Sequence, residues 1–405
     1  MTTLERAYLG THPQISFSVE WRKAPERLWL LLGEAKSKCE HVGGALLTPD
    51  AARELLLVFL TKGALATTAI EGNTLSEDEA RQVIDKTIEL PASKAYLGQE
   101  IENVIAAYNQ IKAEVLQGGH GDLTPGLMAE YNRLILNGLE LDEGVVPGET
   151  RTYSVVVGNY RAAPAEDCDY LLDQLCEWLN GPTFDAPEPD LRAPYAILKA
   201  VLAHLYFAWI HPFGDGNGRT ARLLELQILL AAGLPAPTCQ LLSNHYNFTR
   251  GEYYRQLHLA GRSHDVMPFL LYAVRGFVDG VRDQLQIIWR MQYSDRWKQY
   301  VYEEMGKLKT ETDQRQLRLV LDLTKVGHPV ERSELRHISP AIAEAYAGKT
   351  GRTVARDVNA LLRRGLIVST QAGFEPNSNL IWAFKPEQAE DGIAAPFPAE
   401  TVGVS

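Results

Sequence analysis

The sequence is poor in cysteine and has no long apolar run, and both absences exclude classes of protein. Four of the 405 residues are cysteine, and they form no CxxC pair and show no metal-ligand spacing. We therefore expect reduced thiols rather than a disulfide framework or a structural metal site. No apolar stretch approaches the ~20 residues needed to cross a bilayer, and the first residues, MTTLERAYLG, lack the pattern of a signal peptide. These absences predict a cytoplasmic protein with no membrane partner.

Positive charge is also in short supply. The chain has 40 lysine and arginine residues against 51 aspartate and glutamate residues, a net charge of −11. This balance argues against nonspecific nucleic-acid binding by the chain as a whole. With 45% hydrophobic and 22% charged residues, the composition is that of an ordinary globular protein, and its length predicts two or three domains.

Apolar residues recur at helical spacing along most of the chain before residue 290. Their period predicts helices over 50–72, 96–117, 124–137, 167–180, 193–210, 219–232 and about 249–260. Ser76 and Glu79 stand at the spacing of a capping box, which predicts a further helix start. The segment VVVGNY at 155–160 instead predicts a short β-hairpin that turns at its glycine and asparagine. The expected fold is therefore mainly α, with one β-hairpin at its rim.

The character of the sequence changes after a long polar helix near 280–308. Three helix-like segments, QRQLRLVLDLT, ERSELRHI and TVARDVNALLRRGLIVST, lead into a β-like tail that ends in LIWAF. Three short helices followed by a two-stranded wing are typical of a winged-helix module. Residues 311–370 contain ten lysine and arginine but only seven aspartate and glutamate residues, so this part is locally basic.

The stretch HPFGDGNGRTAR, from His211 to Arg222, carries the most chemical information. A calcium loop is disfavoured because Arg219 occupies the next alternate ligand position and repels a cation. A Walker A loop needs four residues between its glycines and then a lysine, whereas only three residues separate Gly214 from Gly218. A tight turn between two helices, with a satisfied histidine, remains as the structural alternative.

The favoured interpretation of this stretch is an anion-binding loop. Gly214, Gly216 and Gly218 let backbone N–H groups point inward with no Cβ in the way. A helix that starts near Arg219 presents its positive end to the same place. Arg219 and Arg222 are three residues apart and share one face of its first turn, where two guanidinium groups suit a polyphosphate.

Two further side chains of the loop point to phosphoryl chemistry. Asp215 would repel a phosphate unless a divalent cation lay between them, and Mg²⁺ is the natural choice. His211, with an ordinary pKa of about 6.5, can accept a hydroxyl proton at neutral pH. Together these groups describe base-catalysed transfer from a nucleotide phosphate to a hydroxyl.

The residues HPFGDGNGR resemble the motif of the Fic family, HPFx(D/E)GN(G/K)R, at every fixed position, and Arg222 falls where many members have a second arginine. Fic proteins are helical and mostly transfer AMP from ATP to a serine, threonine or tyrosine hydroxyl of a protein. The resemblance implies that His211 is the general base, that Asp215 binds Mg²⁺ and that Phe213 anchors the loop. The phosphate-binding residues that it implies are Gly216, Asn217, Gly218, Arg219, Thr220 and Arg222.

Two other segments resemble parts of a Fic site. The hairpin around 151–163 corresponds to the family's flap, which aligns an extended segment of the target by backbone hydrogen bonds. A plain surface hairpin is the alternative. The segment from Ser243 resembles the wall of the adenine pocket, with Asn247, Phe248 and Tyr254 as candidates, although aromatics at helical spacing are also typical of a core.

The segment TTAIEGN contains a candidate inhibitory residue. From charge alone, Glu71 at the end of an apolar helix is a solvated residue that gains nothing from the helix dipole. Thr67, Glu71 and Gly72 nevertheless match the motif (S/T)xxxE(G/N) of a Fic subclass, in which the glutamate pairs with the second arginine and obstructs the γ-phosphate. The resemblance therefore implies autoinhibition by Glu71 through Arg222. Some such enzymes use this glutamate to remove AMP, so the reverse reaction stays open.

The sequence as a whole predicts an autoinhibited, Mg²⁺-dependent protein adenylyltransferase that uses ATP. The expected division is an N-terminal helical region with the inhibitory helix, a Fic core, a linking helix, a winged-helix domain and a disordered tail (1–95, 96–275, 276–310, 311–386 and 387–405). The expected partners are a protein substrate, the chain itself as a target, a second copy in a homodimer, and DNA bound through Arg352, Arg356, Arg363 and Arg364 of the winged helix.

Two other functions remain as alternatives at this stage. The chain could be a DNA-binding regulator that uses the Fic core only as a nucleotide sensor. It could also transfer UMP or another phosphate-linked group, because nothing in the loop reads the base. The presence of His211 favours an enzyme, since a sensor needs the anion-binding loop but not the base.

Overall fold

The computed structural model describes residues 6–118, 122–158, 160–306 and 310–382. The chain divides into two compact units, Met1–Leu285 and Gln286–Ser405. The finer division into five parts stays a prediction. The tail expected over 387–405 lies outside the described residues, as does Asn159 of the predicted hairpin turn.

The described part of the first unit consists mostly of helices. Its α-helices are α1 (Ala7–Thr11), α2 (Glu26–Gly43), α3 (Pro49–Ala69), α4 (Glu77–Ile84), α5 (Ala95–Leu116), α6 (Pro125–Leu136), α7 (Cys168–Leu179), α8 (Arg192–Ile210), α9 (Asn217–Ala231), α10 (Leu241–Phe248), α11 (Arg250–Ser263) and α12 (Met267–Met305), the last of which continues into the second unit. The helices predicted from periodicity are present as α3, α5, α6, α7, α8, α9 and α11. All four cysteines of the chain lie in this unit, buried and free.

Capping residues set where α3 and α4 begin. Thr48 accepts the backbone N–H of Ala51 at 3.3 Å, at the start of α3. The hydroxyl of Ser76 accepts the N–H of Glu79 at 3.1 Å, and the Glu79 carboxylate accepts the N–H of Ser76 at 2.9 Å. This reciprocal pair is the predicted capping box of α4. It also fixes the end of the turn that follows α3, which contains Glu71.

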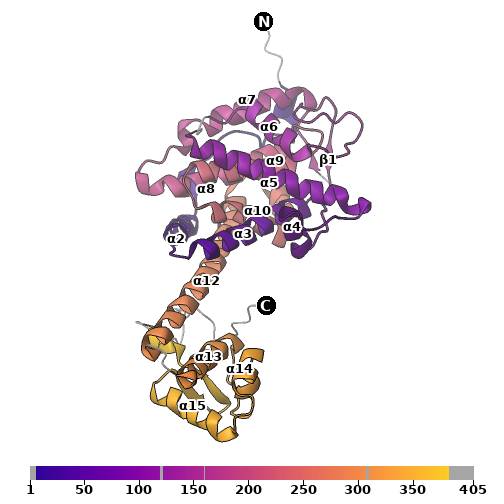
Figure 1. Ribbon diagram of the computed structural model, residues 1–405. Coiled ribbons are helices and arrows are strands. Elements are labelled where there is room, and N and C mark those ends of the chain that lie inside the picture. Colours follow the sequence, from indigo (N-terminus) through magenta and orange to yellow (C-terminus); the bar gives the residue numbers. More distant parts are fainter. Residues whose placement is uncertain (1–5, 119–121, 159, 307–309, 383–405) are drawn as a thin grey trace. The chain divides into compact units, whose positions relative to one another are not determined.

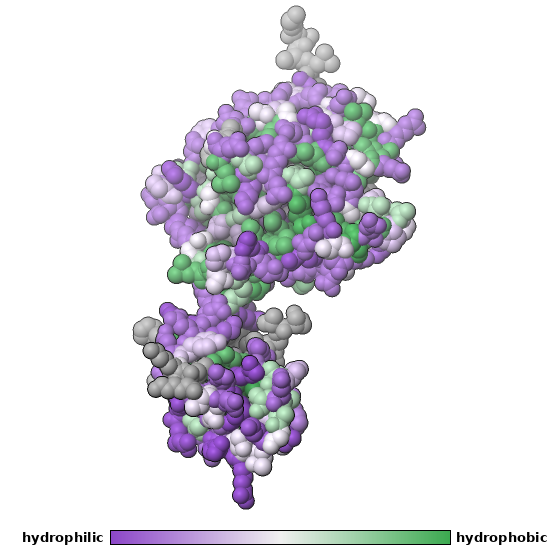
Figure 2. All heavy atoms as spheres, in the orientation of Figure 1, coloured by the Kyte–Doolittle hydropathy of each residue, from purple (hydrophilic) through white to green (hydrophobic). Residues whose placement is uncertain are grey.

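Helix α8 forms the core of the first unit, and Figure 1 shows α8 and α9 surrounded by other helices. By length and composition α8 could cross a membrane, but 72% of its most apolar window is buried inside the chain, as in the core helix of a folded domain. Helix α9 packs along α8, and α5 and α6 pack on α9. On the face drawn in Figure 2, polar and apolar residues are interspersed over this unit. The end of α8 and the start of α9 therefore meet in a packed environment.

The predicted β-hairpin lies between α6 and α7. Its strands, β1 (Val156–Val157) and β2 (Tyr160–Arg161), form an antiparallel pair. The backbone N–H of Ala162 donates to the carbonyl of Val155 at 3.0 Å and extends the pairing by one residue. Both valines of β1 are exposed.

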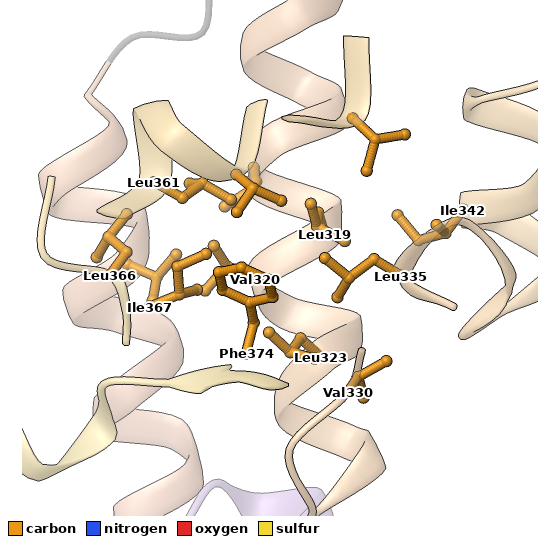
Figure 3. Close-up of a cluster of buried hydrophobic side chains, with 14 of the residues drawn as sticks. Leu319, Val320, Leu323, Val330, Leu335, Ile342, Leu361, Leu366, Ile367 and Phe374 are labelled. Carbon is orange, nitrogen blue, oxygen red and sulfur yellow. The ribbon is translucent and has the colours of Figure 1, made fainter. Parts of the chain in front are cut away.

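The second unit has a separate apolar core, which Figure 3 shows. Its elements after α12 include α13 (Glu311–Val326), α14 (Pro340–Ala345), α15 (Gly351–Arg363), β3 (Ile367–Thr370) and β4 (Gly373–Pro376). The strands β3 and β4 pair in an antiparallel hairpin. Three helices and a hairpin thus follow one another in the expected order, while the assignment to the winged-helix class stays a prediction.

Two segments of this unit differ from expectation. ERSELRHI is a turn that ends in the 3-10 helix η7 (Leu335–His337), and the α-helix begins only at Pro340, because proline suits the first turn of a helix and disrupts its interior. The second strand of the hairpin is β4, and the last two residues of the predicted LIWAF strand lie outside the described residues. Val330 pairs with Phe374 of β4 by two backbone hydrogen bonds, whereas Ser378–Ile381 forms the 3-10 helix η8.

A buried polar network joins α13, α14 and the following helix. The carboxylate of Asp357, which is fully buried on α15, accepts hydrogen bonds from Arg315 Nε at 2.8 Å, Gln316 Nε2 at 3.0 Å and the Tyr346 hydroxyl at 3.1 Å. Arg315 is 7% exposed, so its charge depends on this partner. Tyr346 follows α14 directly, and the network therefore fixes how these helices pack.

We expect Asp357→Ala to lower the free energy of unfolding of the second unit by about 3 to 5 kcal/mol, because it leaves Arg315 as an uncompensated buried charge. Urea denaturation followed by circular dichroism measures this loss. Glu344→Ala, at an exposed position of α14, is the matched control and should change stability by less than about 0.5 kcal/mol. A loss below about 1 kcal/mol for Asp357→Ala would contradict the role given to the network.

Candidate active site

The loop between α8 and α9 has an unusual backbone at both ends. His211, directly after α8, has a φ of +50°, in the left-handed region that few residues other than glycine adopt. Gly216, directly before α9, has a φ of +75°, and a Cβ there would approach Asn132 Nδ2 to 2.9 Å. Only glycine fits this position without strain. The six residues from His211 to Gly216 thus form a compact link that ends at the N-terminus of α9.

Asn217 holds this loop together. Its Oδ1 accepts the backbone N–H of Phe213 at 2.9 Å, and its Nδ2 donates to the carbonyl of the same residue at 2.8 Å. Phe213 is 1% exposed, so its ring anchors the loop in the core as predicted. Both polar groups of the Asn217 side chain are used within the loop. A contact from Asn217 to a phosphate would therefore come from its backbone N–H in the first turn of α9.

Arg151 clamps the backbone around His211. Its Nε donates to the carbonyl of His211 at 2.8 Å, and its other guanidinium nitrogens donate to the carbonyls of Tyr153 at 2.6 Å and Ala163 at 2.5 Å. Its backbone N–H donates to the carbonyl of Pro212 at 2.9 Å. Tyr153 and Ala163 flank the hairpin on either side. One buried arginine, 4% exposed, therefore fastens the base of the hairpin to the histidine.

The surroundings of His211 keep its imidazole neutral. Burial and the positive charge of Arg151 lower the pKa of His211 from 6.5 to about 4. Glu71 acts in the opposite direction but does not cancel these effects. At neutral pH the ring is thus in the form that can accept a proton.

Glu71 and Thr67 hold Arg222, as the motif predicts. Arg222 Nη2 lies 2.6 Å from Glu71 Oε1, and Arg222 Nε donates to Thr67 Oγ1 at 2.6 Å. Burial is the largest single influence and raises the pKa of Glu71, but the charge and hydrogen bond of Arg222, together with Arg219 and His211, bring this pKa below its ordinary value. A Cβ on Gly218 would overlap the Glu71 carboxylate. The carboxylate thus lies against the first turn of α9, and Gly72, with a φ of +109°, turns the chain directly after it.

Arg219 is held by a carboxylate that sequence reasoning missed. Arg219 Nη1 donates to Glu100 Oε1 at 2.7 Å, and its Nη2 lies 3.4 Å from Asp215. The other Glu100 oxygen accepts a hydrogen bond from Asn73 Nδ2 at 2.9 Å. Asn73 belongs to the same turn as Glu71, so this turn is connected to both arginines. Glu100 comes from α5, far away in sequence, and neither it nor Arg151 stands in a recognisable motif.

A cavity of about 540 Å³ adjoins this side of the loop and is lined in part by Glu100, Asp215 and Arg219. The side chain of Asp215 is half exposed, unlike that of Arg219. Within the part of the chain that the structure describes, no group of three potential ligands could hold a metal ion by itself. The half-exposed carboxylate of Asp215 fits a cation of the Mg²⁺ type, which takes one or two protein carboxylates and completes its shell with phosphates and water.

The remaining predicted residues are placed less centrally. Thr220 is fully buried and lies 3.4 Å from Asn132 Nδ2, which gives it a structural contact. Phe248, at the end of α10, is 90% exposed, and Tyr254 on α11 is 41% exposed with the Arg250 guanidinium 6.0 Å from its ring centre. Their assignment to an adenine pocket stays a prediction.

Comparison with known proteins matches this region to a family. Residues 122–229 match the model of the Fic/DOC family. The protein adenylyltransferase fic-1 of Caenorhabditis briggsae is 32% identical over 212 residues, and that of Caenorhabditis elegans is 31% identical over 209 residues. Each alignment covers 52% of this chain but 38% of the relative, so the chain spans well under half the length of these proteins.

Solved structures show the same fold. A Fic family protein from Desulfovibrio desulfuricans superposes with a TM-score of 0.54 at 21% identity, over 86% of this chain and 92% of that one. A fragment of Fic-1 from Caenorhabditis elegans gives a TM-score of 0.50 at 25% identity, over 64% of this chain and 71% of the fragment. The loop, its two arginines and the flanking helices α6, α8 and α9 all fall within or next to residues 122–229, the segment that matches the Fic/DOC family model.

Proposed function

We propose that this chain is a protein adenylyltransferase that Glu71 holds in an inactive state. The observation that carries the proposal is a neutral, half-buried histidine beside a helix N-terminus whose two arginines are both neutralised by carboxylates of the same chain. The family domain and the similarity to proteins named adenylyltransferases support the same reaction class. The chain's substrates and partners are part of the proposal, since the relatives are much longer.

ATP would bind with its phosphates at the start of α9. Backbone N–H groups at the positive end of this helix favour an anion, and Arg219 and Arg222 add two guanidinium groups that suit phosphate oxygens. Asp215 would share a Mg²⁺ ion with the phosphates, and that ion would supply neutralising charge. Gly216 and Gly218 leave room for phosphates to approach the backbone closely.

The transfer step uses His211 as the base. A hydroxyl oxygen of the target attacks the α-phosphorus of ATP, and the O–P bond forms while the bond to the bridging oxygen breaks, so pyrophosphate leaves. The hydroxyl proton passes to a nitrogen of the neutral His211 imidazole. Since the geometry of attack governs the rate, the clamp of Arg151 on the His211 backbone orients the base.

The hairpin β1–β2 would position the target. Its exposed backbone edge can pair with an extended segment of another protein, which needs little sequence identity in that segment. Because Arg151 binds the carbonyls of Tyr153 and Ala163 on either side of the hairpin, a target segment bound there is held in register with His211.

Inhibition follows from competition for Arg222. The Glu71 carboxylate occupies the space above Gly218 and one face of the Arg222 guanidinium, where a terminal phosphate of ATP would bind. Two anions cannot share this place without strong repulsion. Removal of Glu71 should therefore free Arg222 for the nucleotide.

We expect Glu71→Gly to modify itself with AMP when it is incubated with ATP and Mg²⁺, more strongly than the wild type. Intact-mass spectrometry detects the added nucleotide without knowledge of the target. Glu71→Gly/His211→Ala should lose this activity by a factor of about 10² or more, because it lacks the base. Glu89→Gly, at an exposed loop position, is the matched control and should behave like the wild type.

Each arm of this experiment can contradict a part of the proposal. Equal rates in the wild type and in Glu71→Gly would remove the inhibitory role of Glu71. If the double variant modifies itself as strongly as Glu71→Gly does, His211 is not the base. A mass gain with UTP that exceeds the gain with ATP would change the nucleotide transferred.

We expect the rate of Glu71→Gly at saturating ATP to stay nearly constant from about pH 8 to about pH 6 and to fall as the pH approaches 4. The lowered pKa of His211 keeps the imidazole neutral over the upper range. Glu71 raises the pKa of His211, so its removal moves the midpoint further down. A midpoint near the ordinary value of about 6.5 would mean that His211 is not held in this environment.

Arg151 should act as a positioning residue. In the Glu71→Gly background, we expect Arg151→Gln to lower the rate by about 10²-fold while leaving ATP affinity unchanged, because the base is displaced but the phosphate site is intact. Loss of the positive charge should also move the midpoint of the pH profile upward. Arg151→Lys keeps the charge, so its rate should fall without this movement, since one ammonium cannot replace a guanidinium fork.

The control for Arg151 lies outside the hairpin and the loop. Arg192→Gln removes an equal charge from an exposed position at the start of α8 and should leave both the rate and the midpoint unchanged. If Arg151→Gln and Arg151→Lys give identical pH profiles, the charge of Arg151 does not set the pKa of His211. A rate unchanged in both would refute its positioning role.

A further inference from the structure

The second unit carries a stripe of exposed, unpaired basic residues on one helix. Helix α15 buries Val354, Val358 and Leu361 in the core, and its opposite side is exposed. The residues at exposed positions with helical spacing are Arg352, Arg356, Asn359 and Arg363. They stand at intervals of three or four residues, so they share one face.

No carboxylate neutralises this stripe within the described residues. Among the described residues, the ion pairs of the unit involve other basic residues, namely Lys298 with Asp295, Arg315 with Asp357 and Lys325 with Asp322. Arg352, Arg356 and Arg363 form no ion pair in the described part of the chain. The first turn of α15 contains no acidic residue either. Figure 2 shows hydrophilic residues (purple) over the part of this unit where Figure 1 labels α15.

A second basic element adjoins the start of α15. A cavity of about 400 Å³ is lined by Arg332, Ser333, Arg336, Gly351 and Val354. Both of these arginines are exposed, and the N-terminal end of the helix adds its partial positive charge. Glu331 and Glu334 of the same turn form no ion pair with them among the described residues. The basic surface thus extends from the stripe to a concave region beside it.

The chemistry of this surface selects its partner. The stripe has no aromatic or aliphatic anchor of the kind that dominates protein–protein interfaces. It also lacks the aromatic platforms on which single-stranded nucleic acids stack, and the deep, narrow major groove of double-stranded RNA does not admit side chains. Arginine and asparagine are the side chains that recognise guanine and adenine edges in the major groove of DNA.

We propose that α15 is a DNA-binding helix whose exposed stripe enters the major groove, with Arg332 and Arg336 on the phosphate backbone beside it. The stripe runs over the twelve residues from Arg352 to Arg363, or about 16 Å of helix, enough to cover several base pairs. The partner is double-stranded DNA. The inference is independent of the transferase activity, since it concerns the other unit.

The test measures the anisotropy of a labelled, short, random-sequence DNA duplex titrated with the full chain, from about 50 to about 200 mM salt. The wild type should bind with an affinity that falls steeply with salt. Two double variants should each weaken binding by about tenfold or more, namely Arg352→Ala/Arg356→Ala and Arg332→Ala/Arg336→Ala. The variant Arg332→Ala/Arg336→Ala should also reduce the slope of log affinity against log salt concentration by about two. Arg22→Ala/Arg192→Ala removes two exposed charges from the first unit and should have no effect.

Asn359→Ala separates base recognition from charge. It should change the preferred sequence in a selection from random duplexes while leaving the salt slope unchanged, because asparagine contributes no charge. Thermal unfolding checks that each variant is folded. Absence of salt-dependent binding by the wild type, equal losses in the control, or equal binding of double-stranded RNA would overturn the proposal. Binding of an acidic protein without binding of DNA would make this unit a protein-docking module instead.

Discussion

The structure around the loop depends on the neutralisation of two buried arginines. Arg219 and Arg222 are 5% and 3% exposed, and both lie within the first two turns of α9, near the end where the helix dipole is positive. Such a concentration of positive charge is costly unless anions accompany it. Glu71 supplies one and Glu100 the other, and Asp215 lies at the margin. The ion pairs of Glu71 and Glu100 with these arginines thus help to fix the positions of the turn after α3 and of helix α5.

In the proposed function, this balance would let one site serve both inhibition and catalysis. Carboxylates of the chain and the phosphates of a nucleotide would neutralise the same two arginines. The protein is therefore stable without a ligand, and a bound nucleotide would have to displace a carboxylate. The contact of Asn73 with Glu100 matters in this respect, because it connects the turn of Glu71 to the partner of Arg219. Movement of that turn would therefore change the contacts of both arginines. In energetic terms, the proposed release from inhibition exchanges the carboxylates of the chain for the phosphates of the nucleotide.

Much of this arrangement could be predicted from the sequence, and the exceptions share a physical cause. The helices follow from their apolar period, the α4 cap from Ser76 and Glu79, and the pairing of Glu71 with Arg222 from a motif that specifies both positions. Arg151 and Glu100 could not be found in this way, because each acts on backbone or side chains far away in sequence and its own neighbours contain no pattern. The start of α14 at Pro340 and the strand β4 were missed for a related reason, since long-range packing overrode the local signal.

The left-handed backbone of His211 has a thermodynamic consequence for the whole first unit. A residue other than glycine in this conformation costs about 1 to 2 kcal/mol, which the clamp of Arg151 and the anchoring of Phe213 offset. Glycine at this position would relieve the strain and at the same time remove the proposed base. If the proposed function holds, selection for stability alone would discard the residue on which the reaction depends. A screen for thermostable variants of this chain should therefore accumulate glycine at position 211.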